Sequence, residues 1–248
     1  MGAVPKKAFV LAAGKGERMR PLTDNCPKPM LMVDGRTMLD RCLDALLEAG
    51  VEDVVVNTFY LAEMIENHLK SRKRPRITIS HETELLDTGG GAKKMIGFFG
   101  DEPFYALNAD IVWTEGKEPA LKRLADKWDD AKMDLLLLLH PSAQIPAYAG
   151  RGDYYLAEGT DKPVFAKGNN LKANTIFAGP RIVHPRLFNG APDGAFSFLE
   201  LFHKAEKAGR LYALRHDGDW HHVGTPEALA ETNRILSSYR HSRAGGNP

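Results

Sequence analysis

Glycines and cations gather in one stretch near the N-terminus, Leu11 to Pro29, with the sequence LAAGKGERMRPLTDNCPKP. Gly14 and Gly16 allow a tight turn in which backbone N–H groups can approach an anion, because no Cβ stands in the way. Cationic residues follow in the same loop: Arg18, Arg20 and Lys28. After a buried strand, such a loop predicts a binding site for a triphosphate.

Two common phosphate-binding patterns do not fit this stretch. A Walker loop needs a glycine, four residues and then Gly-Lys-Ser/Thr, and nothing after Gly14 supplies that spacing. A dinucleotide fingerprint needs a third glycine where the chain has Met19. The remaining pattern is G-x-G-x-R-M-x-P-L-T, followed by Pro27-Lys28-Pro29. A structural turn with solvated basic side chains is the plain alternative.

This pattern resembles the signature of the sugar-nucleotide pyrophosphorylases, which are nucleotidyltransferases that join an NTP to a sugar 1-phosphate. A second segment, Trp-x-x-Val-Gly-Thr-Pro at 220–226, resembles the same family, and the likeness extends over residues 7 to 238. It implies in-line attack of the sugar phosphate on the α-phosphorus, with pyrophosphate leaving. The nucleotide-binding residues implied in the loop are Leu11, Ala13, Gly14, Lys15 and Gly16. The catalytic residues implied are Arg18, Lys28 and Asp110.

A second glycine-rich segment, Glu82 to Gly91, reads ETELLDTGGG and is expected to form a loop that enters a helix. Three successive glycines serve as a flexible helix entry, or let a flat ring lie against the backbone. In the resembled family this loop holds the base, which implies that Glu82, Thr88 and Gly89 contact it. Asp-Thr-Gly-Gly-Gly is similar to the Glu-Thr-Gly-Gly-Gly of the branch that uridylylates N-acetylmuramate 1-phosphate in cell wall recycling. UTP is therefore the expected nucleotide.

Two other functions stay open. Guanylyl transfer to mannose 1-phosphate is the alternative within the same enzyme class. A catalytically weak nucleotide-sugar-binding or regulatory subunit is the alternative outside it. Arg18, Lys28 and Asp110 favour the enzyme, since a sensor has little need of a full clamp for pyrophosphate.

A carboxylate at the tip of an apolar strand, Asp110 after Phe104-Tyr105-Ala106-Leu107, predicts a Mg²⁺ site, because Mg²⁺ prefers hard oxygen ligands. The resemblance implies a second metal carboxylate directly before Val-Gly-Thr-Pro, but His222 stands there. Imidazole is a poor ligand for Mg²⁺. Three readings remain: His222 contacts metal or phosphate, Asp219 reaches in, or one carboxylate suffices.

The sugar is expected to bind in an inserted β region at about 140–180, where hydrophobic periodicity is lost among prolines and glycines. The resemblance implies Asn108, Asn174 and Gly179 as sugar-binding residues. The family's Glu-Lys-Pro has only a loose counterpart in Asp161-Lys162-Pro163, so no sugar-binding role is carried across to it.

Alternating strands and helices are predicted to position these residues. Apolar runs near 8–11, 53–57, 77–81, 104–110 and 133–139 are strand-like, and helical periodicity separates several of them. This order predicts an α/β, doubly wound, mostly parallel, Rossmann-like sheet with ligands at the carboxyl ends of its strands. One nucleotidyltransferase domain is expected over 1–240, followed by a disordered tail at 241–248.

Composition excludes several other classes of protein. The chain has 248 residues and a net charge of +1, so no global field favours nucleic acid or an anionic membrane. Its two cysteines form no metal or redox spacing, and no apolar run approaches a membrane span. We expect a cytoplasmic protein, a monomer or small homo-oligomer, whose partners are an NTP and a sugar 1-phosphate.

Overall fold

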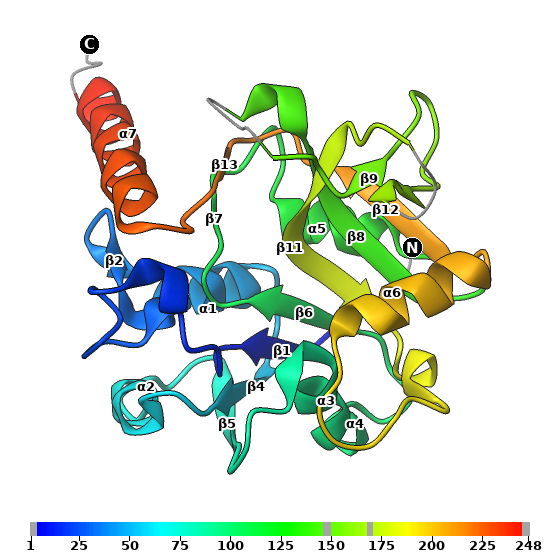
Figure 1. The fold of residues 1–248 in the computed structure, drawn as a ribbon, viewed down its shortest axis with the longest axis horizontal. Helices are drawn as coiled ribbons and strands as arrows, with labels where there is room; N and C mark the ends of the chain where they lie inside the picture. The colour runs from blue at the N-terminus through cyan, green and yellow to red at the C-terminus, as the bar shows by residue number, and fades with distance from the viewer. Residues whose placement is uncertain (1–3, 146–149, 168–170, 245–248) are drawn as a thin grey trace.

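The parallel half of a single sheet forms the centre of the molecule (Figure 1). A computed structural model describes residues 4–145, 150–167 and 171–244 of the chain. Four strands pair in the order β6-β1-β4-β5, and all of these ladders are parallel. They are β1 (Lys7–Leu11), β4 (Asp53–Thr58), β5 (Arg76–His81) and β6 (Phe104–Asn108). Because the strands are parallel, the residues that follow β1, β4, β5 and β6 lie along one edge.

The other half of the sheet is mixed, with parallel and antiparallel ladders. Strand β11 (Thr175–Val183) pairs antiparallel to both β6 and β8 (Leu135–Pro141), and β12 (Leu211–Arg215) pairs parallel to β8. The register of β11 shifts between Phe177 and Arg181, so the strand contains a bulge there. The predicted α/β, mostly parallel sheet is confirmed.

Helices cover both faces of the sheet, because alternate strand residues belong to different cores. Val54 and Val56 belong to one cluster with residues of three helices, and Val55 belongs to the other with residues of three more. The first face carries α1 (Met38–Glu48), α2 (Ala62–Leu69) and α5 (Ala120–Lys127). The second carries α3 (Asp87–Lys94), α4 (Ile96–Phe99) and α6 (Phe198–Lys207). This is the doubly wound arrangement that the sequence predicts.

Short strands and single helical turns complete the fold. Strands β9 (Tyr154–Tyr155) and β10 (Val164–Phe165) extend it beyond β11, which agrees with the small β region expected at about 140–180. Residues 146–149 and 168–170 of that region lie outside the described residues. Two small antiparallel pairs complete the strands: β2 (Met32–Val33) with β3 (Arg36–Thr37), and β7 (Val112–Trp113) with β13 (Trp220–His221). Single turns of 3₁₀ helix occur at Glu17–Met19, Lys28–Met30, Ser142–Gln144 and Pro185–Phe188.

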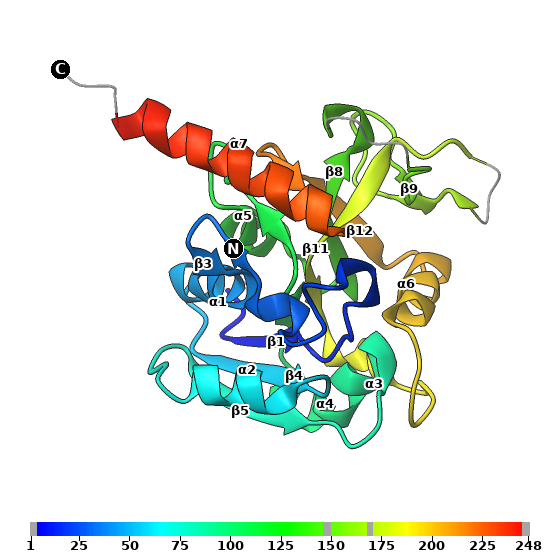
Figure 2. The same cartoon turned by 60° about the vertical axis from the view of Figure 1, so that its left-hand side comes forward.

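The last helix, α7 (Pro226–Ala244), lies across the N-terminal segment (Figure 2). Leu229 and Leu236 of α7 share a third apolar cluster with Met19 and Leu31 of the N-terminal loop. Helix α7 thus packs against the N-terminal segment that contains the cationic residues. It continues to Ala244, into the segment 241–248 for which the sequence predicts a disordered tail, and residues 245–248 lie outside the described residues.

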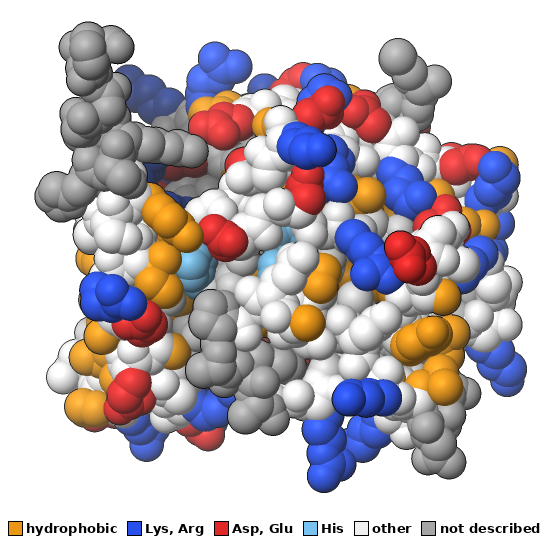
Figure 3. Space-filling model, turned by 90° about the horizontal axis from the view of Figure 1, so that it is seen from above, with side chains coloured by type: hydrophobic (Ala, Val, Ile, Leu, Met, Phe, Trp, Pro, Cys, Tyr) orange, Lys and Arg blue, Asp and Glu red, His pale blue; other side chains and the backbone are white. Residues whose placement is uncertain are grey.

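Charge is distributed evenly over the face shown in Figure 3, where basic and acidic side chains are interspersed. This matches the net charge of +1. Within the described part of the chain, no helix combines the length and the apolar character needed to cross a membrane.

Candidate functional site

Two cavities adjoin at the carboxyl edge of the sheet. The first has a volume of about 550 Å³ and the second about 300 Å³. The first lies between the N-terminal loop and the start of helix α3, and its wall includes Asn57, Leu85, Asp87 and Thr88. The nucleotide-binding residues predicted from the loop all line it: Leu11, Ala13, Gly14, Lys15 and Gly16. The residues that line both cavities are Arg18, Lys28, Asn108, Asp110 and Gly224.

Local contacts explain the glycine pattern of the N-terminal loop. Gly16 adopts φ of 65°, and a Cβ there would come within 3.0 Å of Lys28 Cβ and 3.1 Å of Thr23 Cγ2. Only glycine adopts this conformation readily, so it lets the loop close on Lys28. The Thr23 hydroxyl donates a hydrogen bond of 2.9 Å to the Gly16 carbonyl and closes the turn. A Cβ added to Gly14 would meet no atom within 4 Å. Packing therefore does not require a glycine at this position, and the missing side chain leaves space in the cavity.

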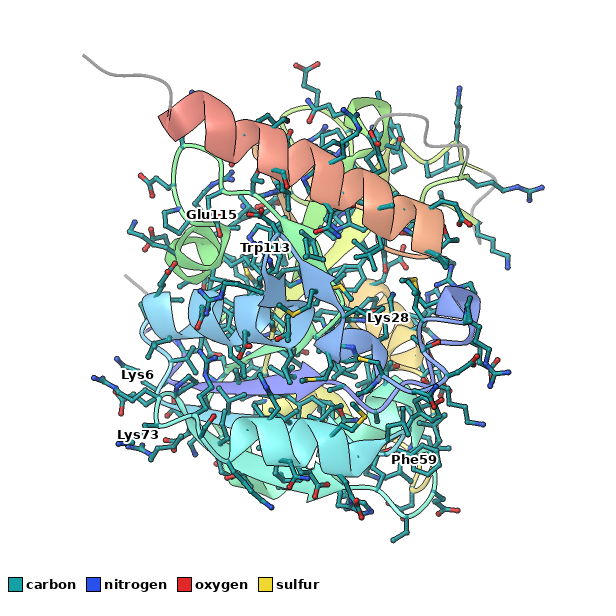
Figure 4. All side chains as sticks on the ribbon, turned by 90° about the vertical axis from the view of Figure 1, so that its left-hand side faces the viewer. Lys6, Lys28, Phe59, Lys73, Trp113 and Glu115 are labelled. Atoms are coloured by element: carbon teal, nitrogen blue, oxygen red, sulfur yellow. The ribbon has the colours of Figure 1, made fainter. Side chains whose placement is uncertain are left out.

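The cations of the loop differ in how they are held. Arg18 is exposed, and its guanidinium has no acidic partner among the described residues. Lys28 begins a 3₁₀ turn and lies at the same end of the sheet as Phe59, which follows β4, and far from Lys6, which precedes β1 (Figure 4). Its Nζ lies 2.6 Å from Asp110 Oδ2, and the side chains are 12% and 33% exposed. The two cations and Asp110 therefore meet where the cavities join.

A buried network fixes the two walls of the first cavity relative to each other. The Ala12 N–H donates to Asn57 Oδ1 at 2.8 Å, and Asn57 Nδ2 donates to Glu82 Oε1 at 2.7 Å. The Leu86 N–H donates to Glu82 Oε2 at 3.0 Å. Glu82 is 1% exposed and does not line the cavity. Its carboxylate connects the segment 82–91 to the N-terminal loop through Asn57. Asn57 is not among the site residues predicted from the sequence. The signal was nevertheless present, because Asn57, like Asp110, is a polar residue at the end of an apolar strand.

The three successive glycines of the segment 82–91 pack closely against other parts of the protein. They lie inside helix α3 (Asp87–Lys94), so the loop predicted over Glu82 to Gly91 ends before them, and the alternative of a flexible helix entry does not apply. A Cβ at Gly89 would overlap the ring of Phe196, and one at Gly90 would overlap the Gly194 carbonyl. A Cβ at Gly91 would come within 2.7 Å of Glu82 Oε1. Thr88 lines the first cavity as predicted, but Gly89 is not among the residues that line it.

Gly89→Ala is expected to reduce the stability of the fold by about 1–3 kcal/mol, because the added methyl group must displace Phe196. Gly97→Ala is the matched control, since it also lies in a helix on the same face and meets nothing within 4 Å. That control should stabilise the protein by about 0.4–1 kcal/mol. Denaturant unfolding checks both values. A Gly89→Ala protein of parental stability with weakened NTP affinity would show instead that Gly89 faces the nucleotide.

The second cavity contains residues to which the sequence assigns no role in the site. Asp153 lies on its wall, with Oδ2 accepting a hydrogen bond of 2.8 Å from the Phe177 N–H. Trp220 lines the cavity as well, with Nε1 donating to the Ala178 carbonyl at 3.1 Å. His221 also lines the cavity, and burial lowers its pKa. No motif marked Asp153, because it follows an irregular segment.

The three predicted sugar-binding residues differ in whether they line the two cavities. Asn108 lines both cavities, as expected for a residue between nucleotide and sugar. Asn174 instead binds the backbone of Leu156, with its Oδ1 accepting at 2.9 Å and its Nδ2 donating at 3.0 Å. Gly179 adopts φ of 106° at the bulge of β11, where a Cβ would come within 2.5 Å of Ile111 Cδ1. Neither Asn174 nor Gly179 lines a cavity, so both support the strand.

His222 and Asp219, the two candidates for the second metal ligand, lie in different places. His222 lines the second cavity, and its imidazole lies against Gly224. Its pKa is lowered, first by burial and then by the charges of Arg18 and Lys28. Asp219 Oδ2 instead lies 3.4 Å from both the Thr114 hydroxyl and the Tyr239 hydroxyl. Asp219 lines neither cavity, so the reading in which it reaches into the site is not supported.

In the described part of the chain, protein side chains alone do not form a complete metal site. Within residues 4–145, 150–167 and 171–244, no three His, Cys, Asp or Glu side chains gather closely enough to hold an ion. Asp110 is therefore the carboxylate at the junction, with Oδ1 left for a further ligand while Oδ2 binds Lys28. Mg²⁺ is commonly held by one or two carboxylates together with substrate phosphates and water. One carboxylate at the junction of two cavities fits that donor set.

Comparison with known proteins agrees with this geometry. A model of the family described as "Nucleotidyl transferase" matches residues 7–238. N-acetylmuramate alpha-1-phosphate uridylyltransferase of Caulobacter vibrioides is 38% identical over 96% of this chain and 100% of the relative. The Neisseria meningitidis protein of the same name is 30% identical over 94% and 100%. Mannose-1-phosphate guanyltransferase beta-B of Xenopus laevis is 28% identical over 95% and 66%.

A solved structure shares the fold. UDP-glucose pyrophosphorylase complexed with UDP-glucose superposes with a TM-score of 0.75 at 20% identity, covering 95% of this chain and 99% of that one. The family resemblance predicted from the sequence is confirmed. The chain that carries the cationic loop, the strand-end aspartate and the paired cavities therefore belongs to the nucleotidyl transferase family.

Proposed function

We propose that this protein transfers uridylyl from UTP to N-acetylmuramate 1-phosphate, giving the UDP-sugar and pyrophosphate. The observation that carries the proposal is the pair of cavities that share Arg18, Lys28 and Asp110. Two ligands bound side by side there would meet at these charges. The names of two relatives, 38% and 30% identical over nearly the whole chain, support this choice of nucleotide and sugar. The expected setting is the cytoplasm, and the expected role is cell wall recycling.

The proposed reaction needs no strong general base. The attacking oxygen belongs to a phosphate that is already ionised at neutral pH, and it displaces pyrophosphate from the α-phosphorus in line. Catalysis then depends on holding the two phosphates together and on neutralising the charge that develops. The cation-lined junction of the two cavities serves both purposes.

Each residue of the junction has a proposed role. Backbone N–H groups of 14–16 bind the triphosphate, which enters the space left open at Gly14. Arg18, which has no acidic partner among the described residues, clamps the leaving pyrophosphate with its planar fork. Lys28 lines both cavities and contributes a compact cation to the two reacting phosphates. Asp110 orients Lys28 through their contact of 2.6 Å.

Asp110 is also the proposed ligand of Mg²⁺. The ion, when bound, would supply Lewis-acid neutralisation of phosphate oxygens. Asp110 provides one hard carboxylate, and the substrates and water provide the remaining oxygens. The lowered pKa of His222 keeps its imidazole neutral at neutral pH, and a neutral imidazole adds no negative charge to the site. We infer that His222 contributes shape and hydrogen bonding, and that Asp110 holds the metal without a second carboxylate.

The role of His222 predicts how kcat depends on Mg²⁺ concentration. His222→Ala should leave the Mg²⁺ concentration for half-maximal kcat unchanged, because the ring is not a ligand. His222→Asp should lower that concentration, because it places a second hard oxygen ligand at the junction. Titration of kcat with Mg²⁺ in the three proteins checks this. A rise of about tenfold in the half-maximal concentration for His222→Ala would identify the imidazole as a ligand.

The first test of the proposal is a pyrophosphate-release assay with UTP and N-acetylmuramate 1-phosphate. Release should require both substrates, and EDTA should abolish it. Release that starts only when GTP and mannose 1-phosphate replace them would support guanylyl transfer. Binding of UTP without release, under any sugar phosphate supplied, would support the non-enzymatic binding subunit.

A further inference from the structure

A buried cation without a counter-ion lies next to the junction of the cavities. Arg181 is 1% exposed, and its Nη1 donates to Asn108 Oδ1 and to the Gly179 carbonyl, each at 2.9 Å. In the described part of the chain no carboxylate pairs with its guanidinium, and its Nε has no hydrogen-bond partner. Burial of an uncompensated charge is costly, so such a residue needs an explanation beyond packing.

Three aromatic rings hold the guanidinium of Arg181 in place. Its Cζ lies 4.3 Å from the ring centre of Phe198, 5.4 Å from that of Phe177 and 5.8 Å from that of Phe202. Faces of aromatic rings attract cations, and these contacts compensate part of the lost hydration. Burial lowers the pKa of Arg181 to about 9, so the side chain remains protonated at neutral pH. The guanidinium is therefore a fixed donor.

Because the Arg181 guanidinium can only donate hydrogen bonds, it determines which end of the Asn108 amide faces Arg181. Arginine has five N–H donors and no acceptor, so Asn108 must present its Oδ1 to Arg181. The Nδ2 group is then on the other side of the amide. No acceptor for Nδ2 is found within the described residues, and Asn108 lines both cavities beside Lys28 and Asp110. Asn108 therefore offers N–H donors, and not its oxygen, to a ligand at the junction.

We propose that Arg181 is a positioning residue that locks Asn108 as a hydrogen-bond donor to an acceptor oxygen of the sugar 1-phosphate. This inference rests on the proposed function, because it takes the ligand of the second cavity to be the sugar 1-phosphate. Arg181 lines neither cavity itself. Phe177, against which its guanidinium packs, lines the second cavity, and Asn108 is the cavity-lining residue to which Arg181 donates a hydrogen bond. A charged residue within the apolar strand β11 was the sequence signal for this role, and no motif marks it.

Asn108→Asp separates stability from activity. The new carboxylate supplies the counter-ion that Arg181 lacks, so the melting temperature should be at least that of the parent. The same change removes the N–H donors and turns an oxygen toward a phosphate, so kcat/KM for the sugar 1-phosphate should fall at least about tenfold. KM for UTP should change less than KM for the sugar 1-phosphate, because Asn108 also lines the first cavity but residues of the N-terminal loop hold the nucleotide as well. Asn67→Asp is the control, because it places the same charge beside Lys70 Nζ, 2.7 Å away on the exposed surface of α2.

Arg181→Met tests whether Arg181 acts through Asn108. It removes the donor, so the Asn108 amide can rotate, and kcat/KM for the sugar 1-phosphate should fall about threefold to tenfold. In an Asn108→Ala background the same substitution should cause no further loss, because the amide that Arg181 orients is gone. Arg181→Lys keeps a charged donor and should recover part of the loss. If Arg181→Met does not fold, Arg181→Lys alone and combined with Asn108→Ala complete the same comparison.

Several results would overturn the inference. An equal loss from Arg181→Met in both backgrounds would show that Arg181 acts on the whole fold. A parental kcat/KM in Asn108→Asp, or a melting temperature below the parent, would show that Asn108 is not the oriented donor. A parent that turns over no sugar 1-phosphate would overturn the proposed function instead, while the melting temperature of Asn108→Asp still tests the contact with Arg181.

Discussion

Asp110→Asn is expected to lower kcat for UTP and the sugar 1-phosphate by at least about a hundredfold while the protein stays folded. Loss of one charged group that stabilises a transition state typically costs about 2.7–4 kcal/mol, which corresponds to about 10²–10³ in rate. Asparagine keeps an oxygen that can accept from Lys28 Nζ, now 2.6 Å from Asp110, so the local packing is preserved. It removes the carboxylate charge that Mg²⁺ requires.

The Asp110 experiment is read from single-turnover rates over a range of Mg²⁺ concentrations. Excess Mg²⁺ should recover only part of the rate in Asp110→Asn. Asp129→Asn is the matched control, since Asp129 also pairs with a lysine, Lys132, at 2.8 Å but lines neither cavity. That protein should keep the parental rate. An Asp110→Asn protein with parental kcat at every Mg²⁺ concentration would remove Asp110 from the proposed site.

Arg18→Ala is expected to have the second large effect, a loss of about a hundredfold in kcat/KM for UTP. The guanidinium of Arg18 is exposed, lines both cavities and has no acidic partner among the described residues, so its charge is available to the leaving pyrophosphate. Because Arg18 is exposed and no ion pair with the described residues is lost, the melting temperature should not change. Steady-state rates at varied UTP, together with a thermal melt, check both expectations.

Arg20→Ala provides the control within the same loop. Arg20 is also exposed, but its Nε pairs with Asp24 at a distance of 3.4 Å, and it lines neither cavity. Exposed ion pairs contribute about 0–1 kcal/mol, so this protein should match the parent in stability and rate. Equal losses in Arg18→Ala and Arg20→Ala would mean that the loop contributes only a general positive field.

The cationic loop could be predicted from sequence because local chemistry determines it. The left-handed Gly16, the hydrogen bond from Thr23 and the approach of Lys28 all lie within one short stretch. Asp110 was found for a related reason, since a polar residue after an apolar strand lies at the ligand-binding edge of a parallel sheet. The order of strands and helices followed from hydrophobic periodicity, and the doubly wound sheet confirms it.

Long-range packing determined what the sequence could not show. Gly89 looked like a contact for the base, but its lack of a Cβ is needed against Phe196, over a hundred positions along the chain. Glu82 looked like a ligand residue and instead binds Asn57 and the Leu86 N–H. Asn174 is used by the backbone of Leu156. A polar or glycine residue in a functional loop can serve the ligand or the loop, and only tertiary contacts distinguish these uses.

One competition reaction tests the central claim most directly. The purified protein is given Mg²⁺ with equal concentrations of UTP, GTP, N-acetylmuramate 1-phosphate and mannose 1-phosphate, and the products are identified by mass spectrometry. Product ratios under competition report the ratio of kcat/KM values. We predict that UDP-N-acetylmuramate forms in excess over every other nucleotide sugar, with one pyrophosphate released per molecule. Predominant formation of GDP-mannose, or no nucleotide sugar at all, would contradict the proposed function.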